Sequence, residues 1–82
     1  MDNKDIRLLI IAAFRYSLGR RTYMHEFIVN LIIKNSEIFN LHDWKRFIDE
    51  INEEENLGYP CDIQTWGKLV CFSENKLKNK RT

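Results

Sequence analysis

Cysteine and histidine are the side chains of this sequence that could support covalent or metal chemistry. Cys61 precedes a predicted helix, whose amino terminus would favour a thiolate, and His25 or His42 could act as its base. Two cysteines and two histidines also match the ligand count of a zinc site, but neither type forms the close pair that such sites use. We therefore expect a semi-buried thiol at Cys61, no metal or cofactor, and no enzymatic activity.

Arginines surround a predicted turn in the segment FRYSLGRRTY, residues 14–23. Arg15 falls within an apolar segment, where a charge requires a carboxylate partner. Carboxylates near predicted helix starts are Asp62, Asp43 and Glu26. We predict that Arg15 or Arg20 forms a structural clasp, with Asp62 as the favoured partner.

Two exposed groups of residues are candidates for partner contact. The first group, beside the turn, consists of Arg20, Arg21 and Tyr23. The second is an acidic run at the predicted end of a helix, where negative charge opposes the helix dipole, and it contains Glu53, Glu54 and Glu55. A solvated acidic face is the alternative interpretation of this run.

Apolar residues at helical spacing predict four helices, at about residues 3–18, 22–35, 41–57 and 63–75, with Asn40 as the cap of the third. The predicted fold is an all-α, compact bundle of about four short helices in a single domain, 1–75. Residues 76–82 would form a basic, disordered tail. An α+β alternative places a short strand at 68–73, KLVCFS, and Gly67 is expected to pack closely against Trp44 or Trp66.

The 82 residues allow one domain, and the formal charge of +1 excludes a strongly basic nucleic-acid coat. The longest apolar run, Leu8 to Phe14, is too short to span a bilayer, and the amino terminus lacks the features of a signal peptide. We therefore expect a cytoplasmic protein with no membrane partner. The first helix is apolar on more than one face, so we expect it either to be central in the fold or to lie at a subunit interface, the second case giving a homodimer through that helix.

A helix-turn-helix outline is present around Gly19, but its second helix, YMHEFIVNLIIKN, has few groups that could read base edges. Contact with phosphates through Arg20, Arg21 and the basic tail stays open as an alternative function, that of a small nucleic-acid-associated regulator.

Two stretches, RYSLGRRTY and LGYPCDIQTW, carry a pattern of the form R-Y-x-L-G-R-x-T-Y followed by L-G, an Asp and a Trp. The positions that meet it are Arg15, Tyr16, Leu18, Gly19, Arg20, Thr22, Tyr23, Leu57, Gly58, Asp62 and Trp66. The pattern resembles a broad group of small uncharacterised proteins encoded by phages and prophages.

The resemblance implies a phage accessory protein, a class that includes host-takeover and anti-defence proteins such as anti-CRISPR inhibitors. The expected function is non-enzymatic binding of a host protein or ribonucleoprotein complex in the host cytoplasm, with stoichiometric inhibition of a bacterial defence complex as the leading form.

Overall fold

The computed structural model describes residues 2–18, 24–56 and 63–79. These residues form four α-helices and one short 3₁₀ helix, in the order α1 (Asn3–Ser17), α2 (Met24–Lys34), η1 (Ser36–Ile38), α3 (Leu41–Asn56) and α4 (Ile63–Asn79). The prediction of an all-α bundle of four helices is confirmed. Residues 68–73 lie inside α4, so the α+β alternative with a strand there is wrong.

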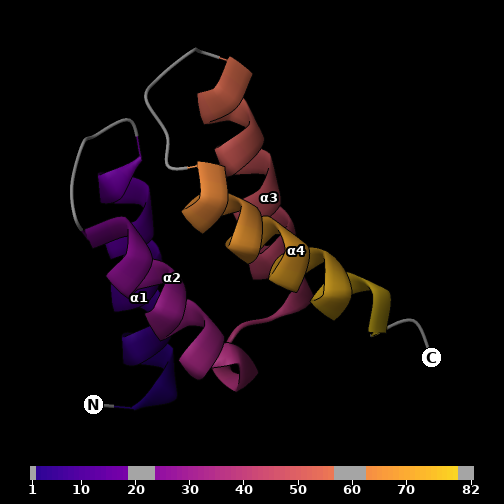
Figure 1. Cartoon of the computed structure of the whole chain (residues 1–82). Coiled ribbons are helices and arrows are strands. Elements are labelled where there is room, and N and C mark those ends of the chain that lie inside the picture. The colour runs from indigo at the N-terminus through magenta and orange to yellow at the C-terminus, as the bar shows by residue number, and fades with distance from the viewer. Residues whose placement is uncertain (1, 19–23, 57–62, 80–82) are drawn as a thin grey trace.

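The helices form two packed pairs that are joined through α4. α1 and α2 lie beside each other as an antiparallel pair, and α3 packs with α4 (Figure 1). α4 also packs against α2, which connects the two pairs. The principal extents of 35, 31 and 16 Å make the molecule flat. The smallest extent, 16 Å, corresponds to a thickness of about two helices at the usual spacing of about 8–10 Å. Because the molecule is so thin, each helix keeps one side toward solvent.

The core is an aromatic cluster with aliphatic residues around it. Each α-helix contributes a fully buried side chain, and these are Phe14, Ile32, Phe47 and Leu69. The Phe14 ring meets Phe47 edge-on at a centroid distance of 5.0 Å and Trp66 at 5.6 Å. Edge-to-face pairs add about 0.5–1.5 kcal/mol each to the stabilisation from burial. The cluster therefore holds α1, α3 and α4 together.

α1 is apolar on two opposite sides, as its sequence predicts. Ile10, Ile11 and Phe14 are buried in the core, whereas Leu8 and Leu9 remain 49% and 59% exposed. The helix begins with Asp2 as its cap, because the Asp2 carboxylate accepts a hydrogen bond from the backbone N–H of Asp5 at 2.9 Å.

The start of α3 confirms Asn40 as its cap. The Asn40 side-chain oxygen accepts a hydrogen bond from the backbone N–H of Asp43 at 2.9 Å, and the Asp43 carboxylate accepts one from the Asn40 backbone N–H at 3.0 Å. This reciprocal arrangement is a capping box with aspartate at its third position. It orients Asp43 as well as starting the helix.

α4 is longer than predicted and includes the first part of the segment expected to be a disordered tail. It continues to Asn79, so the boundary at residue 75 is corrected for residues 76–79. Leu77 packs against the core, and the Lys76 ammonium lies 5.6 Å from the centre of the Phe72 ring. Lysines are also favourable in the last turn of a helix, because they offset the negative end of its dipole.

Gly67 does not have the packing role toward Trp44 that the sequence suggested. Apart from its two chain neighbours and the nearby backbone of α4, a Cβ at this position would have no neighbour within 4 Å among the described residues. The prediction that Gly67 allows close packing against Trp44 is therefore wrong, and the prediction for the adjacent Trp66 stays a prediction. Trp66 instead points into the core, where it contacts Phe14 and His25.

Candidate functional site

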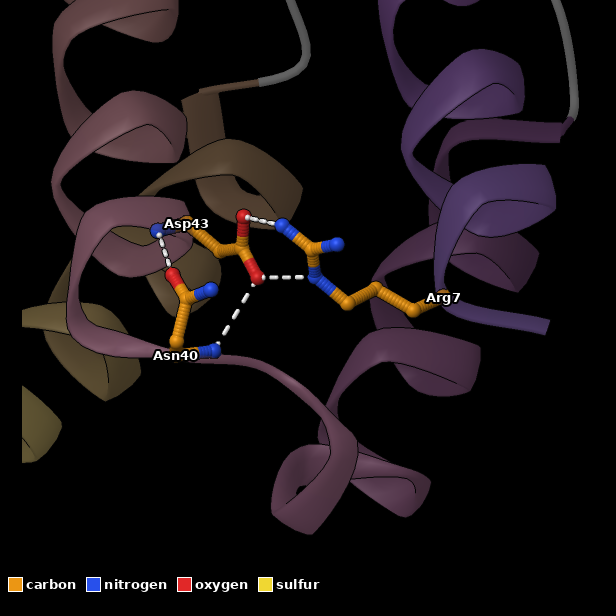
Figure 2. Close-up of polar contacts among 3 residues, drawn as sticks. All are labelled: Arg7, Asn40 and Asp43. Atoms are coloured by element: carbon orange, nitrogen blue, oxygen red, sulfur yellow. Dashed lines mark hydrogen bonds and ion pairs between the residues drawn. The ribbon is translucent and has the colours of Figure 1, made fainter. Parts of the chain in front are cut away.

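A part-buried ion pair between Arg7 and Asp43 joins α1 to the start of α3. Figure 2 shows the Arg7 guanidinium reaching Asp43 from one side while Asn40 contacts it from the other. Arg7 donates from Nε to Asp43 Oδ2 at 2.6 Å and from Nη2 to Oδ1 at 2.7 Å. The Asp43 side chain is only 3% exposed, and that of Arg7 is 25% exposed. The bidentate geometry fixes the relative orientation of the two helices.

Electrostatics keep this pair ionised. Burial by itself raises the pKa of Asp43, but the hydrogen bonds from Arg7 and from the Asn40 backbone, with the positive charge of Arg7, outweigh burial. The pKa of Asp43 therefore lies below its ordinary value of 3.8. The hydrogen bond to Asp43 in turn raises the pKa of Arg7. Since both oxygens of Asp43 accept hydrogen bonds from this chain, the pair acts as a structural clasp.

Sequence reasoning assigned no role to Arg7, although two signals pointed to it. Arg7 is the only charged residue between Ile6 and Phe14. Its position also places it on the same side of α1 as Ile10 and Phe14, three and seven residues later. An arginine on the buried side of a helix needs a carboxylate partner, and the capping position of Asp43 supplies one.

Arg15 has an unexpected partner among the described residues and is more exposed than expected. Its Nε donates to Glu50 Oε1 at 3.0 Å, and its side chain is 56% exposed. Asp62, the expected partner, lies outside the described residues, and Asp43 pairs with Arg7. Arg15 is therefore a surface residue of the apolar helix and not an internal one.

Both arginine contacts run from α1 to α3. Arg7 and Arg15 lie eight positions apart on α1, which is about two helical turns. Their partners, Asp43 and Glu50, lie seven positions apart on α3, which is also about two turns. Since the earlier arginine meets the earlier carboxylate, α1 and α3 run in the same direction. The carboxy-terminal ends of α1 and α3 therefore lie at the same end of the molecule (Figure 1).

This shared end of the molecule carries the predicted partner-binding acids. Glu53 and Glu55 are exposed and Glu54 is half-buried, all in the last part of α3. Arg20, Arg21 and Tyr23 lie outside the described residues. They follow the end of α1 and precede α2, whose first residue Met24 is 49% exposed, and Tyr16 in the last turn of α1 is 70% exposed.

Histidine and cysteine show no catalytic arrangement within the described residues. His25 is buried, its Nε2 donates to the Ser17 carbonyl oxygen at 3.0 Å, and its ring lies 4.6 Å from Trp66. His42 is exposed at the start of α3 and Cys71 is exposed on α4. Cys61 lies outside the described part of the chain. Among the described residues, no group of three His, Cys, Asp or Glu side chains could hold a metal ion.

The surface hollows formed by the described residues are open and polar or lie at helix ends. One hollow of about 290 Å³ lies between α2 and α4 and is lined by Glu26, Val29, Asn30, Gln64, Thr65 and Lys68. Another of about 350 Å³ lies along the end of α4, lined by Phe72, Asn75, Lys76 and Asn79. Neither contains a histidine, a cysteine or a pair of carboxylates that could perform acid and base catalysis.

Over the residues that the structure describes, none of the helices has the length and apolar character needed to cross a bilayer. In comparisons with known proteins, the sequence matches no family model, no curated protein and no solved structure. The function is therefore inferred from the surfaces of the molecule itself.

Proposed function

We propose that this chain is a non-enzymatic accessory protein of the phage type, which acts by binding a host macromolecule. The leading target is a bacterial defence complex, a protein or ribonucleoprotein that the chain inhibits stoichiometrically in the host cytoplasm, as anti-CRISPR proteins do. The resemblance of its two motif stretches to phage and prophage proteins supports this origin. The surface at the shared end of α1 and α3 supports the binding activity.

The observation that carries the proposal is the charge distribution in the last turns of α3. Glu53, Glu54 and Glu55 lie there, and the last turn contains no basic residue. Each acid near the negative end of the helix dipole costs about 0.3–1 kcal/mol when it is not compensated. A stability cost that is concentrated on one exposed surface is typical of a functional site.

The alternative, a nucleic-acid-associated regulator, needs phosphate contacts from Arg20, Arg21 and the basic end of the chain. The end of α1 and the start of α2, which flank residues 19–23, lie far from the end of α4 (Figure 1). The described residues adjoining these two basic segments are thus on opposite sides of the molecule. This separation disfavours one continuous phosphate-binding surface.

Affinity capture from a bacterial host lysate tests the proposal. Tagged protein is incubated with lysate, with and without nuclease, and the retained material is identified by mass spectrometry. We expect a protein or complex that resists nuclease. Nucleic acid that is lost after nuclease treatment or at moderate salt would instead support the phosphate-binding alternative.

A matched pair of double variants locates the binding surface. The double variant Glu53→Gln, Glu55→Gln should no longer capture the partner. Its melting temperature should rise, because both substitutions remove negative charge that opposes the helix dipole. Glu37→Gln with Glu74→Gln removes the same number of exposed carboxylates elsewhere and should retain the partner. Equal capture by the two double variants would contradict the assignment of this surface.

A further inference from the structure

The side of α1 that faces away from the core carries an apolar surface, which we call the α1 stripe. It consists of Leu8, Leu9, Ala12 and Ala13, all of them exposed. Asp5 precedes the stripe and Tyr16 follows it on the same side of the helix, since residues three and four positions apart share a helix face. The core-facing residues Ile10, Ile11 and Phe14 occupy the opposite side.

Side-chain size along the α1 stripe is asymmetric. Two large leucines occupy its amino-terminal half, and two small alanines occupy its carboxy-terminal half. If two copies of the stripe pack antiparallel, about a twofold axis at the level of residues 10 and 11, Leu9 of each copy faces Ala12 of the other. Leu8 of one copy and Ala13 of the other lie at the same level, on the two edges of the contact. The large Leu9 side chain then fills the space left by the small Ala12 side chain, which favours close helix packing at the centre of the contact.

Charge favours the same direction. In the antiparallel arrangement, Asp5 of one copy lies opposite the uncharged Tyr16 of the other, and the two Asp5 carboxylates lie far apart. In a parallel arrangement, Asp5 would face Asp5 and two like charges would oppose each other. We propose that the α1 stripe binds a second copy of this chain in an antiparallel, twofold-symmetric dimer. This inference goes beyond the proposed function and does not depend on it.

The expected interface is small. A contact made by one helix per partner falls at the low end of specific interfaces, which bury about 1,200 Å² in total or less. The dimer should therefore be in reversible equilibrium with the monomer.

Sedimentation equilibrium over a range of protein concentrations measures this association. The mass should rise from that of the monomer to that of the dimer, and Leu9→Glu should raise the dissociation constant at least about tenfold because it places charges in the apolar contact. Leu41→Glu is the matched control, since Leu41 is 43% exposed on α3, outside the stripe. A strictly monomeric mass at the highest concentration, or equal effects of the two variants, would overturn the proposal.

Cysteine crosslinking tests the direction and register in a Cys61→Ser, Cys71→Ser background whose fold is verified by circular dichroism. Ala12→Cys lies close to the twofold axis and should form a disulfide with its own copy under mild oxidation. Asp5→Cys alone should not, because its two copies would be about 16 Å apart along the helices. An equal mixture of Asp5→Cys and Tyr16→Cys should give the mixed disulfide. Efficient self-crosslinking of Asp5→Cys would show a parallel pair and would overturn the antiparallel proposal.

Discussion

At the scale of single residues, the carboxylate of Asp43 should make the stability of the protein sensitive to acid. Its pKa in the folded chain is lowered, chiefly by Arg7 and Asn40 acting against burial. A carboxylate with a lowered folded-state pKa stabilises the fold above its unfolded pKa of about 3.9, and this stabilisation is lost as the pH falls through the folded-state pKa. Acid should therefore weaken the contact between α1 and α3.

We expect Asp43→Asn to cost about 2–3 kcal/mol of unfolding free energy at neutral pH, because the charged hydrogen bonds are lost and Arg7 keeps its charge. The difference between variant and wild type should begin to shrink below about pH 4, where Asp43 of the unfolded chain becomes protonated, and should be lost as the pH falls through the lower folded-state pKa. Urea unfolding at several pH values measures both free energies. A difference that stays constant over this range would contradict an ionised Asp43.

The two arginines of α1 should differ strongly in their importance for stability. Arg7→Ala leaves a buried carboxylate without its partner and should cost about 3 kcal/mol, although partial exposure of the site moderates the loss. Arg15→Ala removes an exposed pair and should cost less than about 1 kcal/mol. Thermal unfolding of both variants makes the comparison. Equal losses, or a larger loss for Arg15→Ala, would contradict the assignment of Arg7 as the clasp.

These residues also show which contacts can be predicted from the sequence and which cannot. The cap at Asn40 was predictable, because capping depends on residues that are close together in the chain. The partner of Arg7 was not, because Arg7 and Asp43 are 36 positions apart and several carboxylates were equally available. For the same reason Arg15 was expected to be the internal arginine, whereas Glu50 holds it at the surface.

At the scale of helices, Gly67 is a position where α4 can be strengthened. Glycine inside a helix costs about 0.5–1 kcal/mol relative to alanine. Apart from its chain neighbours and the nearby backbone of α4, an added Cβ meets no described atom within 4 Å. We expect Gly67→Ala to raise the unfolding free energy by that amount and the melting temperature by several degrees. Calorimetry provides the measurement. A lower melting temperature would mean that close packing does require glycine at this position.

Helix lengths were predictable to within a few residues, except at the end of α4. The periodic apolar pattern fixes where a helix can bury a face, and caps mark its start. The lysine-rich end of the chain resembles a solvated tail by composition alone. In the structure α4 continues into that segment, because Leu77 packs against the core and the Lys76 ammonium lies over the Phe72 ring.

At the scale of the whole molecule, a dimer through α1 would carry two acidic α3 ends. An antiparallel pairing of α1 directs the carboxy-terminal ends of the two α1 helices in opposite directions. Since α3 runs parallel to α1, the acidic ends of the two α3 helices also point away from each other. The dimer should therefore bind two partner molecules, and light scattering of the purified complex should give a ratio of two chains to two partners. A ratio of two chains to one partner would contradict this arrangement.

The sequence by itself determined the helices of this protein, the Asn40 cap and the presence of two apolar sides on α1. These properties depend on residues within a few turns of one another, so composition and periodicity report them directly. Only the tertiary structure decided which side of α1 faces the core and which arginine pairs with the buried carboxylate of Asp43. Helix packing brings distant positions together, and the aromatic contacts of Phe14 with Phe47 and Trp66 turn α1 so that Arg7 reaches Asp43 and the α1 stripe faces solvent.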